Sequence, residues 1–257
     1  MRKLIGFACE GETLAATLDE APGATGLLIV SGGNEIRSGA HRGMAMLAQR
    51  LAATGTPVFR YDRRGVGDST GDNGGYLSAA PDLIAAITAF RDAAPHVTRL
   101  IGFGNCDAAS TLALFGRSAG FAKVVLANPW IIEPIDDLPP AAAIRARYAE
   151  RWRDPRSWYR MIRGDIDLRK LVRGVVKLTR TATVGEDGLA ARVGDAIDAW
   201  RDRAVVLLAA RDATALAFAA RYHGGARVVR FDTASHSFAG AENGDALYAE
   251  IAAVIAG

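Results

Sequence analysis

Short apolar runs rich in β-branched residues alternate with longer segments of helical periodicity, and this alternation restricts the fold more than any other feature of the chain. Continuously apolar strands are typical of a parallel sheet that helices cover on both faces. The alternation therefore predicts an α/β fold with a mostly parallel, doubly wound sheet. The runs are GLLIV (26–30), PVFRY (57–61), RLIGF (99–103), KVVLA (123–127), AVVLLAA (204–210) and RVVRF (227–231).

The segments around these runs complete the predicted core. In the first twenty residues, KLIGFA and TLAATL flank a Gly-Glu turn, which indicates an antiparallel hairpin at the start of the sheet. Helical patterns follow Gly43 and Pro81, and another closes the chain in ALYAEIAAVIA. A chain of 257 residues is long enough for one such domain with an insertion.

The strand rhythm stops between residues 133 and 200, where Arg-rich helical patterns replace it. In DLRKLVRGVVKLTR, apolar residues recur at helical spacing and leave the basic residues elsewhere on the circumference. We therefore predict an α/β core of residues 1–132 and 201–257, interrupted by an inserted helical cap of residues 133–200.

Positive charge is concentrated in the predicted cap. Residues 141–180 contain 12 Lys or Arg against 4 Asp or Glu, a local charge of +8, whereas the whole chain carries only +3. A solvated face would explain this excess, but it could also attract an anionic or carrier-bound substrate. Nothing around it resembles a nucleic-acid-binding module, so no nucleic-acid partner is predicted.

The cysteine count and the hydropathy profile indicate the compartment. Cys9 and Cys106 are too few and too far apart for a disulfide framework or a zinc site, so we expect two free thiols and a reducing environment. No window approaches eighteen apolar residues, so no membrane-spanning segment is predicted. We expect a cytoplasmic protein without a metal or an organic cofactor.

The stretch GNCDA (104–108) has the context of a nucleophile in an open α/β sheet. Such a nucleophile lies on the sharp turn between a central strand and the next helix, where helix-end N–H groups face the reacting atom. Here strand RLIGF ends, Gly104 allows a tight turn, Cys106 takes the apex, and Asp107 begins a helical run. A small buried cysteine is the alternative, but an elbow apex points outward.

Two G-x-S-x-G strings match the nucleophile motif in letters but not in context. In GRSAG (116–120), Ser118 follows a helical run and precedes a strand, at the wrong end of the sheet. In GDSTG (67–71), Ser69 lies in a loop with no helix directly after it. We predict a helix stop at the first and a hydrogen-bonding loop residue at the second.

The overall layout resembles the α/β-hydrolase family across almost the whole chain. In that family the acid follows a late strand and the histidine follows the last one, in the order nucleophile, acid, base. Asp212 stands two residues after AVVLLAA, and His236 five residues after RVVRF. The resemblance therefore implies a catalytic triad of Cys106, Asp212 and His236.

The segment SGGNEIRSGAHRG (31–43) resembles the family's His-Gly oxyanion loop, with Ser31 in place of the histidine. The backbone N–H groups of Gly33 and Asp107 are the implied oxyanion donors. Candidates for the pocket lining are further residues of this segment, although His41 could also be an N-cap neighbour and the arginine a solvated side chain. They are Gly32, Asn34, Arg37 and His41.

A finer resemblance joins SGGNEIRSGAHRG, GNCDAAS and ASHSF to the exosortase A system-associated hydrolase 1 family, whose members are encoded beside exopolysaccharide genes. A histidine and a helix N-terminus beside Cys106 favour its ionised thiolate, and dienelactone hydrolases of the same fold use a Cys-His-Asp triad. We therefore expect a hydrolase of a small-molecule ester or thioester that reacts through a thioester acyl-enzyme. The alternatives are an acyltransferase using the same cysteine and a non-catalytic ligand-binding or scaffold protein.

Overall fold

The structure is a computed structural model that describes residues 1–132 and 188–257. The chain divides into two compact units, one of Met1–Ile131 with Ala190–Gly257 and the other of Ile132–Leu189. Most of the predicted helical cap (133–200) and all of its basic segment (141–180) lie outside the described residues. The first unit resumes at Ala190, earlier in the chain than the Arg201 boundary that the strand pattern predicts.

The described strands form one eight-stranded sheet in the order β1-β2-β4-β3-β5-β6-β7-β8. The N-terminal hairpin pairs antiparallel within itself and with β4, and every other pair is parallel. The predicted α/β-hydrolase fold with its mostly parallel sheet is thereby confirmed. The strands are β1 (Arg2–Cys9), β2 (Glu12–Asp19), β3 (Thr25–Val30), β4 (Val58–Tyr61), β5 (Arg99–Asn105), β6 (Lys123–Ala127), β7 (Ala204–Ala209) and β8 (Arg227–Phe231).

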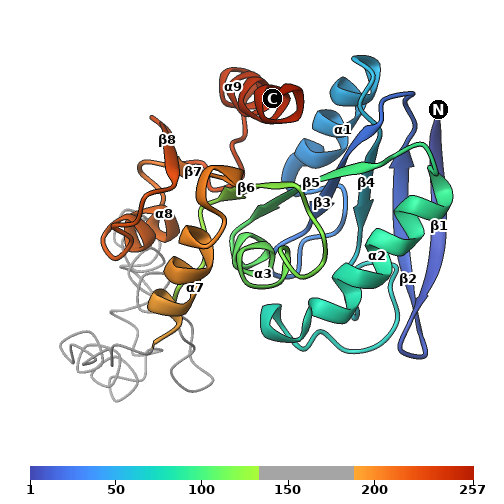
Figure 1. Cartoon of the computed structure of the whole chain (residues 1–257), viewed down its shortest axis with the longest axis horizontal. Helices are drawn as coiled ribbons and strands as arrows, with labels where there is room; N and C mark the ends of the chain where they lie inside the picture. The colour runs from blue at the N-terminus through green and yellow to red at the C-terminus, as the bar shows by residue number, and fades with distance from the viewer. Residues whose placement is uncertain (133–187) are drawn as a thin grey trace, which may run out of the picture. The chain divides into compact units, whose positions relative to one another are not determined.

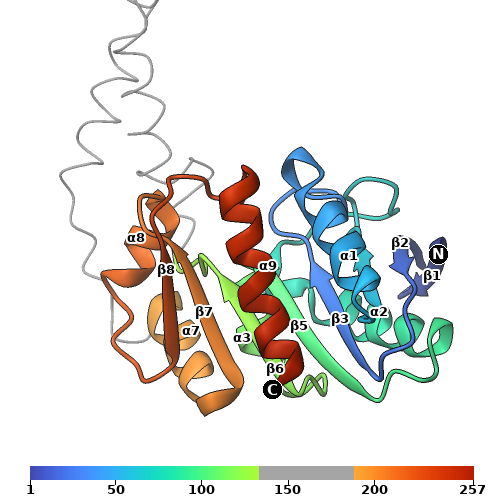
Figure 2. The same cartoon turned by 90° about the horizontal axis from the view of Figure 1, so that it is seen from above.

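Helices cover both faces of this sheet (Figures 1 and 2). α1 (Gly43–Ala53) and α9 (Ala241–Ala256) cover one face, and α2 (Ala80–Ala93), α3 (Asp107–Phe115) and α7 (Leu189–Asp198) cover the other. The remaining helix, α8 (Ala213–Ala219), connects β7 to β8, and short 3-10 helices occur at Ala40–Arg42, Tyr76–Ser78 and Arg201–Arg203. No helix in the described ranges is long and apolar enough to cross a membrane.

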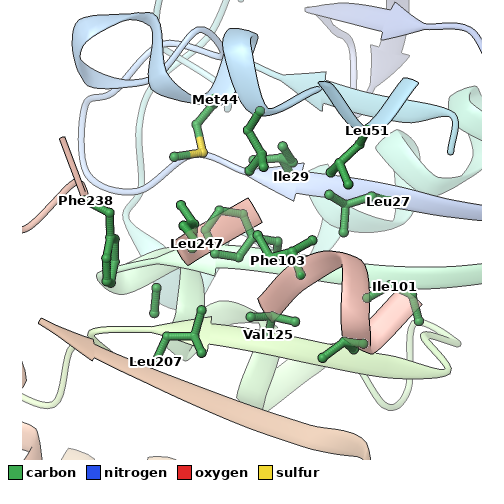
Figure 3. Close-up of a cluster of buried hydrophobic side chains, with 14 of the residues drawn as sticks. Leu27, Ile29, Met44, Leu51, Ile101, Phe103, Val125, Leu207, Phe238 and Leu247 are labelled. Atoms are coloured by element: carbon green, nitrogen blue, oxygen red, sulfur yellow. The ribbon is translucent and has the colours of Figure 1, made fainter. Parts of the chain in front are cut away.

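The core cluster beneath α1 and α9 shows why the central strands read as apolar runs (Figure 3). Alternate side chains of β3, β5, β6 and β7 face these two helices, and burial of each large apolar side chain contributes about 1.5–3 kcal/mol. This packing makes the sheet a rigid support whose carboxyl ends hold the loops of the site. The largest contributors include Leu27, Ile29, Met44, Leu51, Ile101, Phe103, Val125, Leu207 and Leu247.

Candidate active site

Cys106 occupies a sharp turn between β5 and α3, with φ 63° and ψ −128°. Few residues other than glycine adopt this conformation, and such strain is concentrated at functional sites. The turn is tight because α3 crosses β5 closely: a Cβ on Gly104 would lie 2.7 Å from the Ala108 carbonyl carbon. The Cys106 N–H donates to the Ala127 carbonyl at 2.9 Å, which ties the turn to β6. The cysteine is left half-buried at the carboxyl edge of the sheet.

The two serines of the G-x-S-x-G strings have other roles. Ser69 is buried, and its hydroxyl donates to the Asp62 carbonyl at 2.8 Å and accepts from the Ala15 N–H at 2.9 Å. Ser118 is exposed on the turn from α3 to β6, where its hydroxyl donates to the Phe115 carbonyl at 2.8 Å. Both therefore make local hydrogen bonds, and Ser118 lies at the end of the sheet opposite to Cys106.

Asp212 and His236 meet at the same edge as Cys106. The Nδ1 atom of His236 lies 2.9 Å from Oδ2 of Asp212. The same carboxylate oxygen accepts the backbone N–H groups of Thr214 and Ala215, each at 3.0 Å, as the N-cap of α8. Asp212 is therefore both a helix cap and the partner of the histidine, which leaves Nε2 of the ring for another group.

The electrostatics of His236 reflect two acidic partners. Burial favours the neutral ring, but hydrogen bonds to Asp212 and to Cys106, together with the charges of both groups, raise the pKa of His236 to about 10. Burial also opposes ionisation of Asp212, yet the hydrogen bond and charge of His236 and the two α8 amides hold its pKa below the ordinary value. The acidic partners therefore favour the protonated, imidazolium form of His236.

A pair of buried asparagines holds the backbone of His236. The side-chain amides of Asn105 and Asn128 both donate to the His236 carbonyl, at 3.1 and 3.0 Å. Asn128 also donates to Oδ1 of Asn105 at 3.0 Å and accepts the Ala209 N–H at 2.8 Å. This network connects the ends of β5, β6 and β7 to the histidine loop, so the strand ends determine where the imidazole lies.

The loop of residues 31–43, which the sequence predicts to be the oxyanion loop, packs directly on the turn at Cys106. A Cβ on Gly32 would lie 2.4 Å from the Asn105 carbonyl oxygen and 3.4 Å from the Cys106 Cβ, so only glycine fits there. The Gly33 N–H, a predicted oxyanion donor, donates to Oδ1 of Asp107 at 2.6 Å. Arg63, whose side chain is 3% exposed, donates to Oδ2 of Asp107 at 3.1 Å and also to the Gly33 carbonyl.

The three other pocket candidates have different surroundings. Asn34 is exposed, and its Oδ1 accepts from the Asn73 side chain at 2.9 Å. His41 is exposed with φ 52° in the turn before α1. Arg37 pairs with the fully buried Asp62 and with Asp68, the latter at 2.9 Å. Its guanidinium therefore braces the oxyanion loop against the loop after β4 and is neither free for a ligand nor simply solvated.

Several residues near the site were not predicted from the sequence. Arg63, Asn105 and Asn128 follow or end apolar strands at the carboxyl edge, and that position is the signal that could have identified them. Glu35 is half-buried in the oxyanion loop. Burial raises the pKa of Glu35, and the charge of Asp107 adds to this rise. The charge of His236 and a hydrogen bond from the Ala40 amide partly offset it. The backbone N–H of Trp130 donates to the Cys106 carbonyl at 3.2 Å.

The remaining histidines lie away from these groups. His96 bonds the Ala21 carbonyl at 2.9 Å, and both it and His223 are exposed. Within residues 1–132 and 188–257, no group of three or more His, Cys, Asp or Glu side chains is placed to hold a metal ion.

Comparison with known proteins adds the family. Solved structures with similar folds include the esterase Pf2001 of Pyrococcus furiosus (16% identity, TM-score 0.63, 99% of this chain and 89% of that one) and a hydrolase of Pseudomonas aeruginosa PA01 (22%, 0.58, 99% of each). Est1E of Butyrivibrio proteoclasticus, solved with ferulic acid, is similar too (14%, 0.60, 98% and 100%). No curated protein matches. Residues 27–250 match the family described as "Alpha/beta hydrolase family". With this match and the sheet described above, the chain belongs to the α/β-hydrolase family.

Proposed function

We propose that the protein hydrolyses a small-molecule ester or thioester through a thioester acyl-enzyme on Cys106. One observation carries the proposal: a thiol at a strained elbow lies close enough to His236 to contribute to the raised pKa of that ring, and Asp212 binds the Nδ1 atom of the same ring. A thiol is a nucleophile as its thiolate, and the imidazolium of His236 stabilises that form. The resting pair is then thiolate and imidazolium, so no proton has to be removed during attack.

In the acylation step the Cys106 sulfur attacks the substrate carbonyl carbon. A C–S bond forms, and the π electron pair moves to the carbonyl oxygen, which the backbone N–H groups of Gly33 and Asp107 would stabilise. When this intermediate collapses, the electron pair returns and the bond to the leaving oxygen or sulfur breaks. His236 donates its proton to that leaving group, and Asp212 keeps the ring in the required tautomer.

Deacylation repeats these steps with water as the nucleophile. Neutral His236 takes a proton from a water molecule, which attacks the thioester carbon. Collapse of the second intermediate breaks the C–S bond, releases the acid and returns Cys106 to its thiolate form. The two steps use only the chain's own groups and water.

The proposed setting rests on the finer resemblance. SGGNEIRSGAHRG, GNCDAAS and ASHSF are similar to the exosortase A system-associated hydrolases, so we propose a role in exopolysaccharide-related metabolism. Two free cysteines favour the cytoplasm. An anionic or carrier-bound substrate is suggested by the basic segment 141–180, which lies outside the described residues.

Acyl-adduct formation tests the proposal. We expect p-nitrophenyl esters or acyl-CoA thioesters to leave a mass increment on Cys106 that hydroxylamine removes, and Cys106→Ala to form none. Cys9 is the internal control: it is 5% exposed, and burial and the neighbouring Asp82 raise the pKa of its thiol to about 11. Iodoacetamide should therefore alkylate Cys106 well before Cys9.

The lifetime of the adduct separates the alternatives. A hydrolase releases the acyl group into buffer, whereas an acyltransferase retains it until a sugar or amine acceptor is added. A ligand-binding or scaffold protein forms no adduct. Equal alkylation of the two cysteines, with no adduct from donors of several chain lengths, would contradict the enzymatic proposal.

A further inference from the structure

The side-chain carboxylate of Asp107 accepts a hydrogen bond from the Gly33 N–H, which the proposed reaction needs as an oxyanion donor. Asp107 follows the nucleophile, and its Oδ1 accepts the Gly33 N–H at 2.6 Å. The proposed reaction requires the same N–H for the carbonyl oxygen of the substrate. One N–H group cannot make two strong hydrogen bonds at once. The Asp107 side chain and the substrate oxygen therefore compete for it.

Arg63 provides a second partner for this carboxylate. Its Nη2 donates to Oδ2 of Asp107 at 3.1 Å, while its Nε and Nη1 are buried and have no hydrogen-bond partner among the described residues. Arginine binds a carboxylate most strongly through two N–H groups in parallel. Rotation of the Asp107 side chain away from Gly33 would allow this bidentate pair, which offsets the hydrogen bond lost.

Arg63 also holds the loop while the carboxylate moves. Its Nη2 donates to the Gly33 carbonyl, and a Cβ on Gly32 would clash with the elbow, so the loop is packed tightly against its support. The contact to the carbonyl does not depend on Asp107. When Asp107 releases the Gly33 N–H, the carbonyl of the same residue therefore stays held by Arg63.

We propose that Asp107 and Arg63 are positioning residues that control the oxyanion hole. In the resting protein Asp107 binds the Gly33 amide; when an acyl oxygen enters, the carboxylate turns to the unused N–H groups of Arg63. Neither side chain touches the reacting atoms, and both act through the Gly33 amide. This inference rests on the proposed function, because it requires acyl transfer to Cys106.

The ratio of two reactions at Cys106 tests the inference. Acylation by p-nitrophenyl acetate develops an oxyanion, whereas alkylation by iodoacetamide does not, so their rate ratio depends on the oxyanion hole and not on thiol reactivity alone. Asp107→Ala keeps the backbone N–H and removes the competitor. We expect this variant to raise the ratio about tenfold or more, the effect of one hydrogen bond to a charged group on an equilibrium.

Asp107→Asn is the matched control, because its amide oxygen can still accept from Gly33 without a charge; it should raise the ratio less than alanine does. Arg63→Lys keeps the charge but not the planar fork, so it should lower the ratio in the wild-type background and leave it unchanged in Asp107→Ala. A ratio that Asp107→Ala leaves unchanged or lowers would overturn the inference. If Arg63→Lys lowers the ratio equally in the wild-type and Asp107→Ala backgrounds, Arg63 does not act through Asp107 and its part of the inference is wrong.

The Gly33 amide signal in ¹H–¹⁵N spectra tests the same contact without any reaction. We expect Asp107→Ala to move this proton signal upfield, as loss of a short charge-assisted hydrogen bond requires. An unmoved signal, with normal acyl-adduct formation, would overturn the role of Asp107 alone. A folded wild-type protein that forms no acyl adduct would overturn the proposed function and this inference together.

Discussion

His236 combines a buried environment with two acidic neighbours, and this combination gives its charge a clear pH dependence. Its pKa in the folded chain, about 10, exceeds the ordinary value of 6.5 that applies after unfolding. A raised pKa means that the imidazolium stabilises the fold fully below pH 6.5 and that this contribution is lost as the pH rises through 10.

We expect the His236 ring signals to titrate in NMR spectra with a midpoint near pH 10, because Asp212 and Cys106 both stabilise the protonated ring. In Asp212→Asn and in Cys106→Ala, each lacking one acidic partner, the midpoint should fall toward 6.5. Cys9→Ala is the matched thiol control and should leave the midpoint unchanged. A wild-type midpoint near 6.5 would show that the ring is neutral at physiological pH.

The backbone of the turn from β5 into α3 is strained at its apex, Cys106, and substitutions at this position can measure the free energy of that strain. A residue other than glycine at φ 63° and ψ −128° costs about 1–3 kcal/mol. Glycine adopts such angles readily, although it loses more entropy on folding. The chain therefore keeps a strained cysteine where glycine would be more stable, which is expected where the side chain itself is needed.

Cys106→Gly should be more stable than Cys106→Ala by about 1 kcal/mol, because only alanine keeps a Cβ in the strained conformation. Both variants lack the thiol and should be inactive. Urea denaturation with activity assays measures both effects. Ala109→Gly, within α3, is the control: it should lose about 1–2 kcal/mol, because glycine is a poorer helix former and the substitution also removes a buried methyl group. If glycine at position 106 also destabilises relative to alanine, the elbow is not strained.

The elements were largely predictable from the sequence, whereas the contacts between loops were not. Apolar runs identified β3 to β8 because burial on both faces requires such runs, and the strand-to-helix context singled out Cys106 over two serines. The asparagine pair that holds the His236 carbonyl depends on the meeting of three strand ends, and hydrophobic periodicity carries no information about that. The contact of Asp107 with Gly33 is equally long-range.

Helices cover both faces of the sheet, so a substitution in the core under a helix can change the stability of the whole molecule without changing the groups of the candidate site. The α9 helix closes one face through Leu247, Ile251 and Val254, far along the chain from the elbow. Ile251 is fully buried, whereas Ile84 on α2 is 57% exposed. The same substitution at these two positions thus isolates the effect of burial.

We expect Ile251→Ala to lower the free energy of unfolding by about 2–5 kcal/mol, since it removes buried methyl groups and leaves a cavity. Ile84→Ala should change it by about 0.5 kcal/mol or less. Denaturant titration measures both, and esterase activity below the unfolding transition should be retained in each. Equal losses at the two positions would mean that α9 does not close the core as described.

The first compact unit is assembled from two separate stretches of chain, and the proposed catalytic groups are divided between them. Cys106 and the oxyanion loop belong to Met1–Ile131, whereas Asp212 and His236 belong to Ala190–Gly257. A ribosome delivers the first stretch well before the second. A nascent chain that has emerged only as far as β6 therefore carries its thiol without acid or base. If the proposed function holds, Cys106 therefore becomes a reactive thiol only when translation is nearly finished, and synthesis exposes that reactive form to oxidants for only a short time.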